Sequence, residues 1–163
     1  MTLKMNPTTL GDHKILIETG TFQGDFVESV LHEYDHIHTI EILKPLWEKA
    51  VDKFKDDDNV TCYLGDSSDK LGEILEDIDE PVIFWLDGHT APVSPILKEL
   101  EIIKNHHIKT HTIMVDDVRQ FEKYGTSKEE VRSAPEAINP DYTIEYVNGF
   151  IPDDVIVARI ISE

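Results

Sequence analysis

The sequence predicts an α/β protein in which helices flank a mostly parallel β-sheet. Short apolar runs alternate five times with segments of helical periodicity, and this alternation is typical of a sheet whose strands are joined by crossover helices. The chain then closes with two strand-like runs on either side of Asn148, Gly149 and Pro152, a pattern that indicates an antiparallel hairpin. We therefore expect one domain over residues 1–163, preceded by a polar, flexible lead-in over residues 1–12.

The expected elements follow from apolar spacing and from the residues that begin and end each run. Helices are indicated where apolar residues recur on one face, and Ser127 with Glu130 has the spacing of a capping box. The strands are expected at 14–17, 36–41, 60–64, 82–86, 112–115, 142–147 and 155–161. The helical patterns lie over 26–31, 45–54, 71–78 and 96–103, with a less regular segment from 118 to 140. The run at 82–86 is apolar throughout, which predicts a central strand buried on both faces.

The composition restricts the possible partners. Acidic residues outnumber basic ones 33 to 15, giving a formal charge of −18, so nucleic acids and anionic membranes are disfavoured by repulsion. Cys62 is the only cysteine, no apolar run reaches the length of a membrane span, and residues 1–11 hold no apolar signal segment. We expect a cytoplasmic protein with no nucleic-acid or membrane partner, and Cys62 as a small core residue.

The glycine-rich loop over residues 18–24 connects the first strand to the first helix. Gly20 and Gly24 allow a tight turn beside the free N–H groups of a helix N-terminus, a place where nucleotide cofactors bind. Phe22 stands where a dinucleotide-binding loop would have its second glycine, and Glu18 would repel a pyrophosphate but attract a sulfonium or ammonium group. This loop resembles the first motif of class I S-adenosylmethionine (SAM) dependent methyltransferases, and the order of elements from residue 14 to 163 is similar to theirs, including the final hairpin.

Carboxylates are concentrated where the expected strands end. Because ligands bind outside the carboxyl ends of the strands in open α/β sheets, these residues are candidates for a binding site. Glu41 lies at the position from which an acidic side chain accepts both hydroxyls of a cofactor ribose. Asp66 is similar to the acidic residue that the family places near the adenine amino group, although Ser67 or Ser68 could also simply cap the next helix. The resemblance implies the following SAM-binding residues: Glu18, Thr19, Gly20, Thr21, Phe22, Gly24, Glu41, Ile42, Gly65, Asp66, Ser67 and Asp87.

Asp87, Asp116 and Asp117 are expected to converge, since they follow two strands that we take to be neighbours. Two carboxylates about 4 Å apart repel by roughly 4 kcal/mol at an effective dielectric near 20, so three of them call for a proton or a cation. Oxygen ligands favour Mg²⁺ or another hard divalent ion. The set resembles the metal-dependent small-molecule O-methyltransferases, including the catechol and macrocin enzymes, and the resemblance implies Asp87 and His89 as catalytic residues. The family's basic residue usually stands three positions after the first Asp, where this chain has Thr90, so His89 is one position early.

We therefore expect a SAM-dependent methyltransferase that methylates a hydroxyl of a small molecule or sugar with the help of Mg²⁺. Acceptor contacts are expected from Arg119, Gln120, Tyr124 and Arg132, and a homodimer would let a second subunit cover the acceptor. Two alternatives remain open from the residues alone: a nucleotide-binding or dinucleotide-binding oxidoreductase or epimerase, and a non-catalytic interaction module with the same fold.

Overall fold

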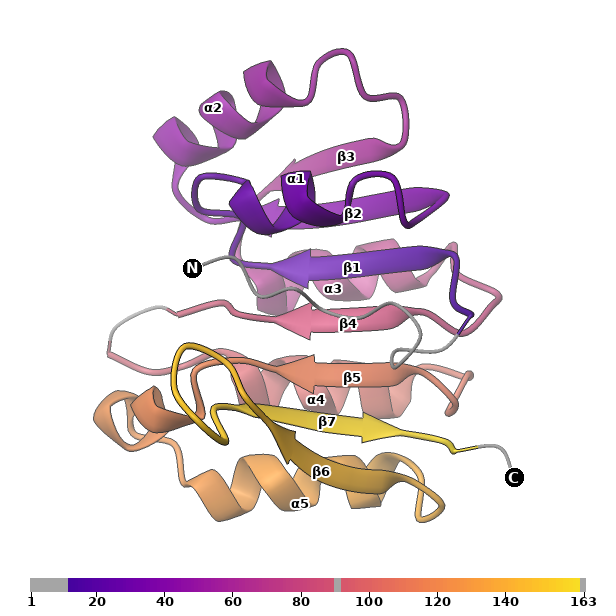
Figure 1. Ribbon diagram of the computed structural model, residues 1–163, viewed down its shortest axis with the longest axis vertical. Helices are drawn as coiled ribbons and strands as arrows, with labels where there is room; N and C mark the ends of the chain where they lie inside the picture. Colours follow the sequence, from indigo (N-terminus) through magenta and orange to yellow (C-terminus); the bar gives the residue numbers. More distant parts are fainter. Residues whose placement is uncertain (1–11, 90–91, 162–163) are drawn as a thin grey trace.

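A computed structural model describes residues 12–89 and 92–161 of the chain, which form a seven-stranded sheet with helices packed on both faces (Figure 1). The strands are β1 (Ile15–Thr19), β2 (His36–Glu41), β3 (Val60–Leu64), β4 (Ile83–Leu86), β5 (Thr112–Val115), β6 (Thr143–Val147) and β7 (Val155–Arg159). The α-helices are α1 (Asp25–Val30), α2 (Lys44–Lys53), α3 (Ser67–Leu75), α4 (Ile96–Asn105) and α5 (Lys128–Ile138), and the 3₁₀ helix η2 covers Val118–Tyr124. The predicted α/β class and the order of its elements are confirmed. The lead-in expected at 1–12 lies, apart from Asp12, outside the described residues.

The strands are ordered β3-β2-β1-β4-β5-β7-β6 across the sheet. The first five are parallel, and β7 is antiparallel to both β5 and β6, which confirms the expected terminal hairpin. The chain moves outward from β1 to β2 and β3 and then returns to the other side of β1 with β4. Parallel sheets open a crevice at such a reversal, so β1 and β4 are the strands whose ends should meet a ligand.

Two apolar clusters hold the helices against the sheet. On one face of the sheet, residues of α3, α4 and α5 pack against side chains of the central strands, among them the fully buried Ile17 and Phe84. On the opposite face, α1 and α2 pack around Leu16 and Ile37, and the ring of Phe26 stacks on Trp85 with centroids 4.6 Å apart. The expected burial of the fourth strand is confirmed, because every residue of β4 is buried. The strand ends that carry the acidic residues are thereby fixed by a packed core.

The segment from 118 to 140, which the sequence leaves irregular, contains η2 and α5. The capping box is confirmed: Ser127 Oγ accepts the N–H of Glu130, and the Glu130 carboxylate accepts the N–H of Ser127. The antiparallel hairpin crosses the carboxyl end of β5 through its loop at 148–154, since Val118 N–H donates to the carbonyl of Asp154 at 3.0 Å. This contact sets η2 beside the hairpin loop.

None of the helices within residues 12–89 and 92–161 combines the length and the apolar character that a membrane-spanning helix requires.

Candidate active site

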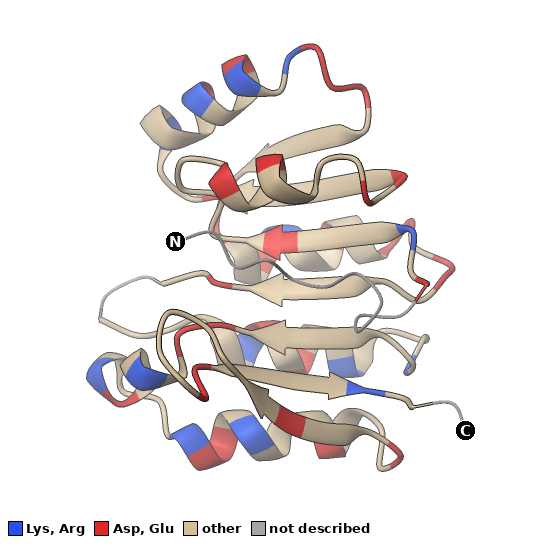
Figure 2. Ribbon diagram, viewed as in Figure 1, with Lys and Arg blue, Asp and Glu red and all other residues tan. Residues whose placement is uncertain are grey.

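A cavity of about 510 Å³ opens at the carboxyl ends of the parallel strands, at the β1/β4 reversal. Acidic residues gather along this edge of the sheet (Figure 2). The cavity is lined by Gly20, Phe22, Ile40, Glu41, Ile42, Leu43, Leu46, Gly65, Asp66, Ser67, Asp87, Gly88, His89, Pro95 and Asp117. The structure thus brings four of the predicted strand-tip carboxylates, Glu41, Asp66, Asp87 and Asp117, to one cavity.

Gly20 brings the tip of β1 against the backbone that follows β4. Its φ of +87° is a conformation that glycine adopts without strain, and a Cβ at this position would lie only 2.5 Å from the carbonyl oxygen of Asp87. The Gly20 N–H donates to the carbonyl of Ile40 at 2.9 Å, which ties the loop to β2. No other residue type would allow this close approach.

The Glu41 carboxylate, which lines the cavity, accepts hydrogen bonds from two backbone N–H groups. Its Oε2 accepts the N–H of Phe22 at 2.8 Å, and its Oε1 accepts the N–H of Leu43 at 2.8 Å. Phe22 has a left-handed backbone, with φ at +50°, and its side chain is 61% exposed at the mouth of the cavity. Since each carboxylate oxygen can accept two hydrogen bonds, Glu41 is held in place and can still accept bonds from a ligand.

Asp66 has two roles in the structure. Its carboxylate lines the cavity, and it caps α3 by accepting from Ser68 N–H at 2.8 Å and from Ser68 Oγ at 2.7 Å. The capping residue is thus Asp66 itself, rather than Ser67 or Ser68 as considered from the sequence. The negative charge of Asp66 stabilises the N-terminus of α3 by accepting a hydrogen bond from an N–H group that has no partner within the helix.

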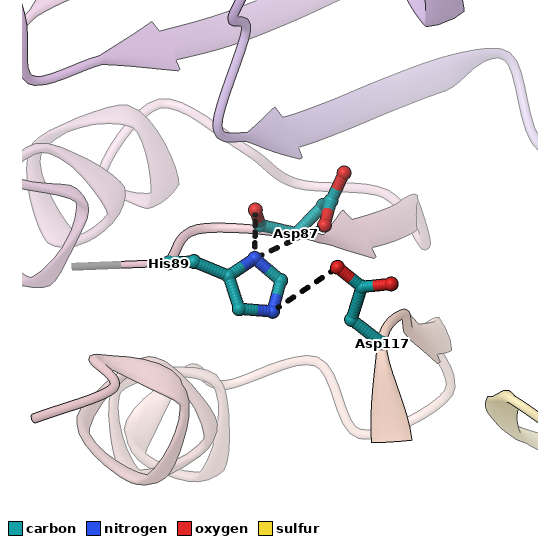
Figure 3. Close-up of side chains that lie close together, drawn as sticks. All are labelled: Asp87, His89 and Asp117. Carbon is teal, nitrogen blue, oxygen red and sulfur yellow. Dashed lines mark hydrogen bonds and ion pairs between the residues drawn. The ribbon is translucent and has the colours of Figure 1, made fainter. Parts of the chain in front are cut away.

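His89 lies between two carboxylates, Asp87 and Asp117 (Figure 3). Its Nδ1 is 2.9 Å from the carbonyl oxygen of Asp87 and 3.3 Å from Asp87 Oδ1, while its Nε2 is 3.6 Å from Asp117 Oδ2. An Nδ1–H that donates to Asp87 leaves Nε2 free to take a proton. Burial alone would lower the pKa of His89, but the hydrogen bond to Asp87 and the charges of Asp87 and Asp117 outweigh it, and the pKa is raised.

The three predicted metal ligands do not meet at a single point. Asp87 and Asp117 converge with His89, whereas Asp116 and Asp117 converge with Asp154 at the end of the hairpin loop. Asp117 is shared by both groups and has a left-handed backbone, with φ at +59°. Asp117 is thus the residue that links the two acidic groups.

Protein donors already engage these carboxylates. Asp117 Oδ1 lies 2.5 Å from Nη1 of Arg119, and its Oδ2 accepts from Gln120 Nε2 at 2.7 Å. Asp154 is 1% exposed and accepts both the backbone N–H and the guanidinium of Arg119. Burial, followed by repulsion from Asp87, raises the pKa of Asp116 to about 7. The site has a surplus of negative charge that Arg119 and His89 compensate in part.

Some residues of the predicted site do not line the cavity. These are Glu18, Thr19, Thr21, Gly24 and Asp116. Glu18 is 2% exposed and accepts a hydrogen bond from Thr39 Oγ1 at 2.5 Å. Burial raises the pKa of Glu18 to about 8, so this carboxyl is mostly neutral near pH 7 and is not the exposed carboxylate expected from the sequence. The reason is tertiary: Glu18 is paired with Thr39 on the neighbouring strand β2, and its side chain is buried there.

Of the predicted acceptor contacts, three lie near the cavity. Arg119 and Gln120 hold Asp117, and the Tyr124 ring is 5.7 Å from the His89 ring. Arg132 instead pairs with Glu136 along α5, with 3.2 Å between the charged atoms.

Several residues at or near the site were not predicted from the sequence. Leu43, Leu46, Gly88 and Pro95 line the cavity, and Asp154 joins the acidic group from a distant part of the chain. Glu99 was also missed, although a signal existed. It stands in the apolar stripe of α4 between Ile96 and Leu100, where a carboxylate is unexpected.

Comparison with known proteins gives structural likenesses only. No protein-family model and no curated protein matches the sequence. Among solved structures, the O-methyltransferase from Bacillus cereus in complex with SAH superposes with a TM-score of 0.69 at 18% identity, over 91% of this chain and 74% of that one. An rRNA methylase from Streptococcus thermophilus superposes with a TM-score of 0.63 at 15% identity, over 96% of this chain and 92% of that one. The SAH-bound methyltransferase PaMTH1 from Podospora anserina gives 0.63 at 15% identity, over 91% of this chain and 72% of that one.

The chain has the class I methyltransferase fold. In this methyltransferase fold, the cavity at the β1/β4 reversal is bounded by the Gly20 loop on one side and by the residues after β4 on the other. The Asp87–His89–Asp117 group stands at the end of the cavity nearest β5, in the direction of η2 and the hairpin loop. This is the fold that the resemblance of the loop over 18–24 and of the terminal hairpin implied.

Proposed function

We propose that the protein is a SAM-dependent methyltransferase that methylates a hydroxyl oxygen of a small molecule or carbohydrate. One observation carries the proposal: the cavity wall contains Glu41, Asp66, Asp87 and Asp117, and none of the described residues that line it is Lys or Arg. Such a wall repels a dinucleotide pyrophosphate and attracts a sulfonium cation with an ammonium group. This charge pattern argues against the oxidoreductase or epimerase alternative.

SAM would lie along the cavity with its amino-acid end beside Gly20 and its adenine at the opposite end. Its ammonium group would face the carbonyls beside Gly20 and Asp87, its ribose hydroxyls would donate to Glu41, and its adenine would contact Ile42 and Asp66. The exposed Ile42 side chain supplies an apolar surface at the rim for the base. The SAH-bound neighbours from Bacillus cereus and Podospora anserina support this ligand class.

In the proposed reaction, a lone pair of the acceptor oxygen attacks the methyl carbon while the carbon–sulfur bond breaks. The electron pair of that bond goes to sulfur, and the products are a methyl ether and the neutral thioether S-adenosylhomocysteine. His89 Nε2 takes the hydroxyl proton, because Asp87 holds Nδ1 and Asp117 lies beside the imidazolium that forms. Asp87 thus orients the base, as the carboxylate does in other Asp–His pairs.

A divalent cation fits the chemistry of this donor set. Asp87 and Asp117 would hold it, and Asp116 would have to move closer to join them, since Asp116 groups with Asp117 and Asp154 in the described structure. Carboxylate oxygens suit Mg²⁺ or Mn²⁺, and burial together with repulsion by Asp117 raises the pKa of Asp87. When bound, the ion would supply positive charge that lowers the pKa of the acceptor hydroxyl. Binding requires Asp117 to exchange its contact with Arg119 for the ion.

The acceptor is expected to carry no phosphate backbone. Although the Streptococcus thermophilus neighbour is named as an rRNA methylase, this chain has a formal charge of −18, and repulsion would weaken any binding to RNA. Tyr124 and the exposed Phe150, whose ring lies 5.1 Å from the Arg119 guanidinium carbon, offer flat surfaces for a sugar or aromatic ring. A neutral hydroxylated ring compound therefore suits the site best.

Calorimetric titration tests the proposal. We expect SAM and SAH to bind the wild type in magnesium buffer and NAD⁺ to give no heat of binding. Glu41→Gln should weaken SAM binding about tenfold or more, since a hydrogen bond to a charged group contributes roughly 1.5–3 kcal/mol. Glu48→Gln is the matched control, because Glu48 is exposed on α2 and pairs only with Lys44 in the described structure.

Methyl transfer is then measured with SAM labelled on its methyl group. Pools of hydroxylated aromatic compounds, sugars and structured RNA form separate arms. Label in a sugar or aromatic product, lost in His89→Ala, supports the proposal. NAD⁺ binding in place of SAM would overturn the cofactor assignment, and label in RNA would overturn the acceptor class.

A further inference from the structure

Glu99 is a carboxyl group that the proposed reaction leaves without a role. It lies in the first turn of α4 and is 0% exposed. Neither of its side-chain oxygens makes a hydrogen bond of accepted geometry in the described structure, although the hydroxyls of Ser67 and Thr19 are close enough to lower its pKa. A buried carboxylate without a firm hydrogen bond is strongly unfavourable, so a group of this kind next to a cavity needs an explanation.

Glu99 lies next to the backbone of Gly88, a residue that lines the cavity. Gly88 lines the cavity, and a Cβ built on it would lie 3.3 Å from Glu99 Oε1 and 3.3 Å from Thr19 Oγ1. Thr19 Oγ1 in turn accepts the Gly88 N–H at 3.3 Å. The carboxyl group therefore stands directly behind the junction of the β1 and β4 tips, where the amino-acid end of the donor is placed.

The surroundings of Glu99 leave it about half protonated near pH 7. Burial raises its pKa to about 7, the hydroxyls of Ser67 and Thr19 lower it, Asp66 at the start of α3 raises it, and His89 after β4 lowers it. A cation that enters the cavity would favour the ionised form further. Glu99 can thus change its charge in response to a ligand.

Glu18 is the other buried carboxyl near this junction, but it has a partner. It accepts from Thr39 Oγ1 on the opposite face of the sheet, and Thr39 Oγ1 also lies 2.5 Å from Thr21 Oγ1. Its hydrogen bond holds β1 to β2. The unpartnered group is therefore the better candidate for a response to ligand charge.

We propose that Glu99 is a buried counter-charge for the ammonium group at the amino-acid end of the methyl donor and that it loses its proton to solvent when the donor binds. The proposal rests on the proposed function and names a positioning residue for it. Glu99 acts through the backbone of Gly88 without touching the reacting atoms. It would make the site favour ligands with an ammonium group over uncharged adenosine derivatives.

The test compares three ligands by calorimetry: SAM, SAH and 5′-methylthioadenosine, which lacks the amino-acid end. Glu99→Gln keeps the shape of the side chain and removes its charge. We expect SAM and SAH to bind this variant about tenfold more weakly, which corresponds to a displacement of the Glu99 pKa by one unit on binding. Binding of 5′-methylthioadenosine should not change. Glu101→Gln on the exposed side of the same helix is the matched control.

A second measurement needs no variant. Wild-type protein is titrated with SAM near pH 7 in buffers of different ionisation enthalpy, and we expect release of a fraction of a proton. Equal affinities of wild type and Glu99→Gln for SAM, equal weakening of all three ligands, or SAM binding without proton release would each overturn the inference. Failure of the wild type to bind any of the three ligands would instead overturn the proposed function.

Discussion

Nη1 of Arg119 lies 2.5 Å from Oδ1 of Asp117, and the same guanidinium is hydrogen-bonded to the buried carboxylate of Asp154. The two carboxylates come from the end of β5 and from the hairpin loop, so one arginine joins segments far apart in the sequence. Its positive charge occupies the place among the carboxylates where a divalent cation would bind. Arg119 and a metal ion are therefore expected to compete for Asp117.

Replacement of Arg119 should increase the affinity for divalent cations. We expect Arg119→Gln to bind Mn²⁺ at least about tenfold more tightly than the wild type, because a positive charge within a few ångströms of the ligands is removed. Titration followed by electron paramagnetic resonance of free Mn²⁺ measures this. The control is Arg132→Gln, since Arg132 pairs with Glu136 on α5. Unchanged or weaker Mn²⁺ binding in Arg119→Gln would show that the guanidinium does not compete with the ion.

Gly20→Ala should destabilise the protein and abolish donor binding. The new Cβ would lie 2.5 Å from the Asp87 carbonyl oxygen, and the φ of +87° is unfavourable for alanine, so we expect a loss of about 2–4 kcal/mol in the free energy of unfolding. Urea denaturation measures the change. Gly72→Ala is a sharp control, because a Cβ there has no heavy atom within 4 Å and alanine favours a helix by about 0.5–1 kcal/mol. Equal stability of the two variants would contradict the geometry of the loop.

Glu18 should make the protein less stable at alkaline than at mildly acidic pH. Its folded-state pKa of about 8 lies above the ordinary value of 4.5, so its contribution is fully present below pH 4.5 and is lost as the pH rises to about 8. We expect the unfolding free energy of wild type relative to Glu18→Gln to fall by about 3 kcal/mol between pH 5 and pH 8. Glu33→Gln, at an exposed position, serves as control. A constant difference would mean that Glu18 is already ionised in the folded protein.

Two buried histidines, His106 and His111, should make the protein less stable at acidic pH, which is the opposite of the effect of Glu18. Val82 N–H donates to Nδ1 of His111, so His111 Nε2 carries the proton that His106 Nδ1 accepts at 2.9 Å, and His106 Nε2 donates to the carbonyl of Ile78. Burial, with the nearby His106, lowers the pKa of His111 to about 3, because a further proton would break this chain of hydrogen bonds.

The contribution of His111 is therefore present above pH 6.5 and is lost as the pH falls from 6.5 towards 3. We expect the stability advantage of wild type over His111→Gln to shrink by about 3 kcal/mol between pH 6.5 and pH 4 in urea denaturation. His107→Gln, at the exposed neighbouring position, should show no such trend. An advantage that stays constant or grows towards pH 4 would contradict the neutral state of the pair.

Local patterns sufficed for the parts of the protein that depend on neighbouring residues in the chain. The apolar run at 82–86, the capping box at Ser127 and the glycines of the 18–24 loop each identify an element, because strand burial, helix capping and turn conformation are short-range properties. Since parallel strands end at one edge, the shared position of Glu41 and Asp87 also follows from the order of elements.

The α/β class, the terminal hairpin and the edge of the sheet that carries the acidic site all follow from the amino-acid pattern. Which carboxyl groups line the cavity, which are buried next to it and which are hydrogen-bonded depends instead on long-range contacts. Glu18 is hydrogen-bonded to Thr39 of β2, Asp154 in the hairpin loop pairs with Arg119 of η2, and Glu99 lies next to Gly88. These relations depend on strand pairing and helix packing between residues distant in the sequence, and burial and neighbouring charge then set the ionisation of each group.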